Sequence, residues 1–359
     1  MKFFARKAFI GLAALLAAEA AARLLIPMDF LAYRDSDDPA LAFELRPGSS
    51  GIKNGVPVEI NEQGLRDEVV PAAKPRDERR VVVVGGHETF GIGVEAKDTF
   101  VRELAEGLIE PGHGRARTVN LSMYSYHFGQ KVELACQRLP GMAPELVVLQ
   151  ITEGDGGSPT PPLFRLPHLK NWIREHSVLV RWASELVYLG PRRERPAPAI
   201  EVAQAPAPAA RVEVKAASAR PGEAAPARAA DARRAVKIEP APPSKEFEEA
   251  RAQLRRFKEC VDAAGARPVV MLLPDITAPP SKSPSELRRG LESAAKELGM
   301  PLLDARPALE ALPPEERAVF PRERFLSPAA QRALADELRR RLRPLLKKRR
   351  VPAPERPSV

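Results

Sequence analysis

The stretch RRVVVVGGHETFGIGVE, residues 79 to 95, decides the fold class because it joins a continuous apolar run to a glycine turn. Val81 to Val84 predict a strand that is buried on both faces, which is typical of parallel sheets. Gly85 and Gly86 then predict a tight turn. In α/β proteins such a turn often carries a nucleophile or a phosphate-binding loop, and here its tip carries His87.

Strand and helix patterns alternate strictly after this turn. Further strands are predicted at residues 116–122, 144–152, 267–274 and 300–304, and helices at 99–110, 129–141, 245–266, 284–299 and 328–346. Strict alternation of this kind predicts a parallel sheet with helices on both faces, hence an α/β domain.

The first 27 residues are typical of an export segment, because Lys2, Arg6 and Lys7 precede the apolar run from Ala8 to Ala18. The uninterrupted run is short for a membrane span, which favours a cleavable signal peptide. Glu19 and Arg23 lie four residues apart and could pair on one helix face, which favours an uncleaved anchor. With an anchor, the remaining chain is expected at the cell envelope, facing the periplasm or the exterior. With a cleaved signal peptide, it is expected to be secreted.

The rest of the chain divides by composition. Residues 28–75 predict an extended N-terminal arm with one short strand at 58–60, and residues 76–346 predict the globular domain. Within this domain, residues 191–244 are rich in Pro, Ala, Arg and Glu and poor in large apolar residues, so a disordered insertion is predicted. Residues 347–359 predict a basic disordered tail. A helix with Trp172 and Trp182 before the insertion is expected to pack over the sheet.

The formal net charge is +9, but much of the positive excess lies in the insertion and the tail. The basic residues do not alternate with aromatic side chains, so nucleic-acid binding is not expected. The sequence shows no metal-ligand spacing and no cofactor motif, and we expect neither.

Five short stretches carry a resemblance to a known family: NEQGLRD at residues 61–67, GGHETFG at 85–91, NLSMYSY at 120–126, QITEGDGG at 150–157 and RERFLSPAAQ at 322–331. Together they resemble the SGNH hydrolases, also called the GDSL family, and especially bacterial envelope members with an N-terminal anchor. The resemblance implies a three-layer doubly wound fold with a five-stranded parallel sheet in the order 2-1-3-4-5, as in flavodoxin. It also implies a site at the carboxyl ends of the strands.

The chain departs from the family at the positions that carry the chemistry. His87 stands where the family has its serine nucleophile, and Gly86 stands where it has an aspartate. Further departures are Ser122 and Ser125 for glycines, Gly154 for the oxyanion asparagine, Arg322 for the acid and Phe325 for the histidine base. Hydrolysis needs a nucleophile, a base and an oxyanion donor together. The sequence therefore predicts a catalytically inactive envelope protein that binds a glycan or an acylated ligand, or acts as a structural partner.

An active enzyme is the alternative. It would be an esterase or O-acetyltransferase acting on envelope polysaccharide, with Ser122 or Ser125 as a relocated nucleophile and His87 or His127 as the base.

The ligand-binding candidates are His87, Glu88, Ser122, Ser125 and Asp155. His87 has three interpretations: a remnant of a lost site, a ligand contact, or a catalytic or metal-binding residue together with Glu88, His127 and Asp155. Asp155 is expected to hold loops together by hydrogen bonds.

The two cysteines test the implied strand order. In a 2-1-3-4-5 sheet with right-handed crossovers, the helices that carry Cys136 and Cys260 are neighbours on one face. We therefore expect the two residues to lie close together. A disulfide and two buried thiols are both compatible with this placement.

Overall fold

The computed structural model of the chain describes residues 2–25, 33–41, 43–53, 56–110, 114–153, 155, 177–179, 244–276, 285–318 and 325–347. Its centre is a five-stranded parallel sheet made of β5 (Glu78–Gly85), β6 (Arg115–Ser122), β7 (Leu146–Thr152), β8 (Arg267–Leu273) and β9 (Leu302–Asp304). The strands lie in the order β6-β5-β7-β8-β9, which is 2-1-3-4-5 in chain order. The predicted fold class and strand order are confirmed.

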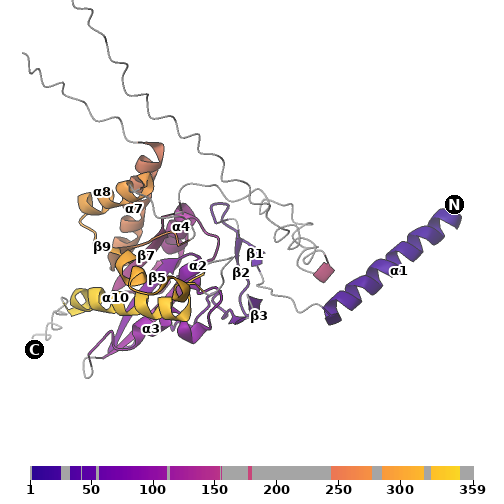
Figure 1. Ribbon diagram of the computed structural model, residues 1–359, viewed down its shortest axis with the longest axis horizontal. Coiled ribbons are helices and arrows are strands. Elements are labelled where there is room, and N and C mark those ends of the chain that lie inside the picture. The colour runs from indigo at the N-terminus through magenta and orange to yellow at the C-terminus, as the bar shows by residue number, and fades with distance from the viewer. Residues whose placement is uncertain are drawn as a thin grey trace, which may run out of the picture. The chain divides into compact units, whose positions relative to one another are not determined.

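Helices cover both faces of this sheet and make it the middle of three layers (Figure 1). One face packs against α4 (Phe128–Arg138), α7 (Lys245–Ala263) and α8 (Glu286–Glu297). The other face packs against α3 (Phe100–Ala105), α9 (Arg306–Glu310) and α10 (Pro328–Lys347). Val82 and Val84 of β5 point into the first core and Val81 and Val83 into the second, as expected for a strand that is buried on both faces.

Three helices differ from the prediction, and the shortest of them is the four-residue α2 (His87–Phe90), which was not predicted. α3 ends at Ala105, five residues earlier than its apolar spacing indicated, because Gly107 takes a left-handed conformation with φ of 68°. The carbonyl of Gly107 then accepts a hydrogen bond of 2.9 Å from Nε of Arg343 in α10. α9 was not predicted, since a five-residue helix with Leu309 as its one buried residue leaves no helical period in the sequence.

The N-terminal arm is folded and not extended, which corrects the prediction. It forms two antiparallel hairpins, one from β1 (Tyr33–Asp35) and β2 (Phe43–Leu45), the other from β3 (Ser50–Lys53) and β4 (Val56–Glu59). Of these strands, only β4 was expected. Strands of three or four residues are too short to show an alternating pattern, so the sequence gives them little signal.

The arm packs onto the domain through both apolar and polar contacts. Phe43 and Val58 belong to the same core as the sheet. The hydroxyl of Tyr126 donates a hydrogen bond to the carbonyl of Phe43, and Nε2 of Gln130 donates one of 2.8 Å to the carbonyl of Leu41. The arm is therefore positioned to contribute side chains to a site near β6.

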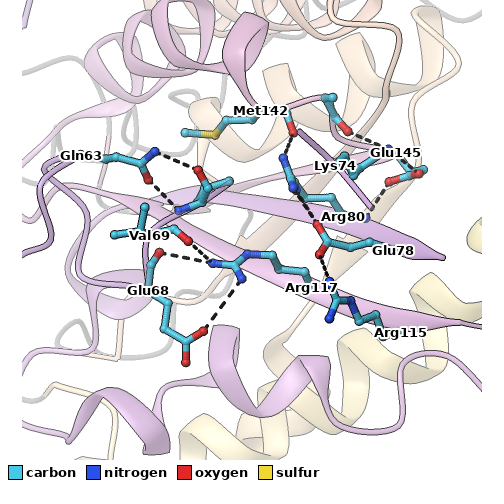
Figure 2. A network of polar contacts seen from close by, with 12 residues as sticks. Gln63, Glu68, Val69, Lys74, Glu78, Arg80, Arg115, Arg117, Met142 and Glu145 are labelled. Carbon is cyan, nitrogen blue, oxygen red and sulfur yellow. Dashed lines mark hydrogen bonds and ion pairs between the residues drawn. The ribbon is translucent and has the colours of Figure 1, made fainter. Parts of the chain in front are cut away.

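A charged network fixes the amino edge of the sheet, where β5, β6 and β7 begin (Figure 2). Arg80 is fully buried and donates two hydrogen bonds to Glu78, of 2.9 and 2.7 Å, and one of 2.6 Å to the carbonyl of Met142. Glu145 accepts a hydrogen bond of 2.6 Å from the backbone N–H of Arg80, and Arg115 lies 3.4 Å from Glu78. Buried charges of this kind need such pairing. The network lies at the edge opposite to the turn at His87.

The N-terminal segment forms α1 (Lys2–Leu25), in which Glu19 and Arg23 make the expected ion pair at 2.9 Å. Among the helices that the structure describes, none has the length and apolar character needed to cross a membrane.

Several predicted segments lie outside the described residues: Trp172, Trp182, residues 191–243 and the tail from residue 348 onward. Ser244 was assigned to the insertion, but it is the N-cap of α7 and its hydroxyl accepts a hydrogen bond from the N–H of Phe247. The domain therefore resumes at Ser244.

The two cysteines form a disulfide between α4 and α7, with the Cα atoms of Cys136 and Cys260 5.0 Å apart. The predicted proximity is confirmed, and of the two open alternatives the structure contains the bonded one. Both helices lie on the same face of the sheet, as the strand order required.

Candidate functional site

The glycine turn is held by Gln150, a buried side chain of the neighbouring strand β7. Oε1 of Gln150 accepts a hydrogen bond of 3.0 Å from the N–H of Gly86 and one of 3.1 Å from the hydroxyl of Thr89. A Cβ atom on Gly85 would lie 1.9 Å from Oγ1 of Thr89. Glycine is therefore required at residue 85, and the turn presents His87 at the start of α2 (His87–Phe90).

Arg66 of the arm holds the exit of the same turn. Its guanidinium donates hydrogen bonds to the carbonyls of Phe90 (2.8 Å), Gly91 (2.5 Å) and Val94 (2.7 Å). It is 4% exposed, and this burial lowers the pKa of Arg66 to about 10. The NEQGLRD stretch thus has a direct structural role, because its arginine fixes the backbone that follows His87.

An aromatic cluster occupies the tip of the turn. The rings of His87 and Phe325 stack, with centroids 5.7 Å apart and planes at 15°. The ring of Tyr124 lies 5.9 Å from that of His87, and Nζ of Lys53 in β3 lies 5.8 Å from the centre of the Tyr124 ring. The structure therefore brings together the two positions that the resemblance assigned to the nucleophile and the base. They carry no hydroxyl–imidazole pair but two stacked rings.

His87 is neutral at ordinary pH. Burial lowers the pKa of His87 from 6.5 to about 4, and the positive charges of Lys131 and Lys53 act in the same direction, while Asp155 opposes them. A neutral imidazole stacks on Phe325 without the cost of desolvating a charge.

This lowered pKa predicts that the protein loses stability as the solution becomes acidic. Between the unfolded pKa of 6.5 and the folded pKa of about 4, the unfolded chain binds a proton that the folded chain does not. The free energy of unfolding should therefore fall as the pH falls through this window, and His87→Gln should reduce the fall. An NMR titration of His87 should show a midpoint near the lower value; a midpoint at the ordinary histidine value would contradict this.

A buried ion pair lies behind His87. Nζ of Lys131, a fully buried side chain of α4, contacts Oδ2 of Asp155 and donates a hydrogen bond of 3.3 Å to the carbonyl of Gln150. A Cβ on Gly86 would lie 3.1 Å from both Cε and Nζ of Lys131. The end of the Lys131 side chain therefore occupies the space that a side chain at residue 86 would need.

Asp155 and Glu88 are both close to this lysine. Asp155 accepts a hydrogen bond of 2.7 Å from the N–H of Thr152, so it ties the end of β7 to α4. Burial raises the pKa of Glu88 above its usual range, although Lys131 and a hydrogen bond from Thr152 favour its ionised form. The backbone carbonyl of Glu88 accepts a 3.2 Å hydrogen bond from Gln331 of α10.

The serines lie in settings unlike that of an activated nucleophile. Ser122 is 4% exposed, and its hydroxyl donates a hydrogen bond to Oδ1 of Asn120. Ser125 has φ of 67°, the left-handed conformation that favours glycine. His127 is the N-cap residue of α4, and burial lowers its pKa.

Two of the predicted positions, Gly154 and Arg322, lie outside the described residues. Within the described part of the chain, no group of three or more His, Cys, Asp or Glu side chains is placed to hold a metal ion.

Comparison with known proteins finds solved structures of a lipolytic protein and of esterases. A G-D-S-L family lipolytic protein from Desulfitobacterium hafniense is 13% identical, with 73% of this chain and 98% of that chain covered and a TM-score of 0.39. A psychrotrophic esterase from Pseudoalteromonas sp. is 10% identical, with 75% and 98% covered and a TM-score of 0.42. An acetylxylan esterase from Geobacillus stearothermophilus, solved as a catalytic mutant, is 14% identical, with 73% and 93% covered and a TM-score of 0.39.

This chain is similar to a lipolytic protein of the G-D-S-L family and to two esterases. No family model matches it, and no curated protein matches it. At such low identity and TM-score the similarity says nothing about activity, and the strand order of the sheet is what establishes the fold.

Sequence reasoning missed three residues of the site: Lys53, Tyr124 and Lys131. Lys53 reaches the site from an arm that was expected to be extended. Tyr124 lies in the NLSMYSY loop, where only Ser122 and Ser125 were considered as site residues. A signal for Lys131 existed in Gly86, because a glycine in place of an aspartate leaves room for another side chain.

Proposed function

We propose that this chain is an SGNH-like protein of the cell envelope that binds a glycan or an acylated ligand without hydrolysing it. The observation that carries the proposal is the stacked pair of His87 and Phe325, 5.7 Å apart, at the tip of the glycine turn. In a serine hydrolase of this kind the hydroxyl and the imidazole would meet here. Among the described residues no hydrogen bond joins a hydroxyl group to the ring of His87, and a pKa of about 4 makes this imidazole a weak general base.

The same side chains suit ligand binding. His87, Tyr124 and Phe325 are partly exposed and present aromatic surface, and Lys53 adds a positive charge beside them. Binding sites combine an apolar or aromatic wall with a few placed polar groups. A sugar ring or an acyl chain can pack on such a wall, while Lys53 and Glu88 contact its polar groups.

The envelope location is part of the proposal. It is supported by Lys2, Arg6 and Lys7 ahead of the apolar run, and by the disulfide, since disulfides persist in oxidising compartments. We propose attachment to the membrane through the N-terminal segment and envelope polysaccharide as the binding partner.

A relocated serine has no supporting observation. Ser122 is buried and bonded to Asn120, and no described contact joins Ser122 or Ser125 to a histidine. We therefore do not favour the esterase or O-acetyltransferase alternative.

The proposal is tested by binding to an O-acetylated polysaccharide and to its alkali-deacetylated form. We expect retention of the protein, weaker retention of Phe325→Ala and Tyr124→Ala, and recovery of the polysaccharide with its acetyl groups intact. Val69→Ala, a change at an exposed side chain of the arm, is the matched control and should bind like the unchanged protein. Equal retention of all variants, or release of acetate by the folded protein, would contradict the proposal.

A further inference from the structure

A hollow lies along the edge strand β6, on the side that faces α3. Its volume is about 540 Å³, within the range of small-molecule binding sites. It is lined by Pro57, Glu59, Arg66, Asp67, Glu68, Glu95, Ala96, Lys97, Thr99, Val101, Arg102, Thr118 and Asn120. His87, Tyr124 and Phe325 are not among these residues, so the hollow is separate from the site at the glycine turn.

The positive charges of the lining are already engaged. Nζ of Lys97 lies 3.0 Å from Glu95. Arg102 contacts Glu68 and lies 3.7 Å from Asp67. The third cation, Arg66, donates hydrogen bonds from its two terminal nitrogens to backbone carbonyls of the glycine turn, while its buried Nε has no partner among the described residues.

Glu59 is the carboxylate that remains. Strand alternation in β4 buries Val58 and turns Glu59 to the opposite face, where it lines the hollow. Among the described residues Glu59 makes no ion pair, whereas the other three carboxylates of the lining do. Arg117, just outside the lining, also lies 3.9 Å from Glu68, so Glu59 is the carboxylate of the lining that is left to pair with a positive group of a ligand.

Thr118 supplies the second observation. It is 4% exposed and lines the hollow, yet its hydroxyl makes no hydrogen bond within the part of the chain that the structure describes. A hydroxyl without a protein partner on the wall of a hollow is suited to a hydrogen bond with a polar group of a ligand. Pro57 and Val101 provide apolar surface on the same lining.

We propose that this hollow binds an amino sugar. Its ammonium group would lie beside Glu59, one of its hydroxyl groups would pair with Thr118, and the C–H face of its ring would pack on Pro57 and Val101. A charge-assisted hydrogen bond to Glu59 is the strongest of these contacts. The inference does not depend on the function proposed for the site at His87.

The test is calorimetric titration of the whole protein with glucosamine and with its β-1,4-linked disaccharide. N-acetylglucosamine is the matched ligand without the charge. We expect the amines to bind and N-acetylglucosamine to bind at least about tenfold more weakly. Glu59→Gln should weaken amine binding by about tenfold or more, while Glu62→Gln, at an exposed arm residue outside the lining, should leave it unchanged.

Thr118 is tested by a pair of variants. Thr118→Val removes the hydroxyl and should weaken amine binding about fivefold. Thr118→Ser keeps the hydroxyl and should bind the amines like the unchanged protein. Thermal unfolding of each variant shows whether it is folded before it is titrated. If Thr118→Val is not folded, the titration of Glu59→Gln alone tests the proposal. Absence of binding by both amines, equal binding of N-acetylglucosamine, or unchanged binding in Glu59→Gln would overturn the proposal.

Discussion

Replacing Cys136 and Cys260 together by alanine is expected to lower the free energy of unfolding by several kcal/mol. The disulfide joins residues 124 positions apart, so it closes a long loop in the unfolded chain. The chain-entropy relation gives about 5 kcal/mol for a loop of this length, and measured disulfides more often contribute about 2–4 kcal/mol. We expect the double variant to unfold at a clearly lower urea concentration than the oxidised protein.

A second measurement separates the bond from the packing of the two side chains. The unchanged protein is unfolded in urea with and without a phosphine reductant, and the reduced protein should match the double alanine variant to within about 1 kcal/mol. This comparison remains informative if the variant is too unstable to purify. Equal midpoints for the oxidised and reduced protein would show that the disulfide does not stabilise the fold.

The second large effect is expected for Lys131→Met, which removes the buried cation behind His87. Lys131 is fully buried, and Asp155 would keep a carboxylate with 17% of its side chain exposed and no ammonium beside it. Breaking a buried ion pair from one side commonly costs about 3–5 kcal/mol, and the partial exposure of Asp155 places the expected loss near the lower limit, about 3 kcal/mol. Urea unfolding at neutral pH measures it.

Two further variants make this prediction specific. Asp155→Asn keeps an oxygen that can accept the hydrogen bond from Thr152, so adding it to Lys131→Met should recover a large part of the loss. Lys258→Met removes a lysine from a more exposed pair with Asp262 and should change stability by no more than about 0.5 kcal/mol. A loss for Lys131→Met as small as that for Lys258→Met would contradict the account.

The sheet could be predicted from the sequence because most of its strands contain continuous apolar runs, and the helices between the strands have apolar residues at helical spacing. Val81 to Val84 illustrate this, since all four are fully buried. The arm could not be predicted, because strands such as Phe43–Leu45 are held by contacts to distant residues, for example Tyr126. Local sequence carries little information about such pairing.

The candidate site was predicted in outline and missed in detail. The motif resemblance placed residues 87 and 325 at one site although they are far apart in the chain, and their rings do stack. The ion pair of Lys131 with Asp155 depends on a side chain from α4 entering the space beside Gly86. The glycine at residue 86 indicates free space, but the sequence does not show which side chain fills it, because that follows from three-dimensional packing.

The measurement that tests the central claim most directly is the reaction of the folded protein with a serine-directed fluorophosphonate probe, alongside hydrolysis of acetyl and butyryl esters. With His87 stacked on Phe325 and Ser122 bonded to Asn120, we expect no labelling and no turnover above the uncatalysed rate. His87→Ser should also remain unlabelled, because Phe325 supplies no base and the members of a triad act as a unit. Labelling or ester turnover by the unchanged protein, abolished in Ser122→Ala or Ser125→Ala, would contradict the account and establish a relocated nucleophile.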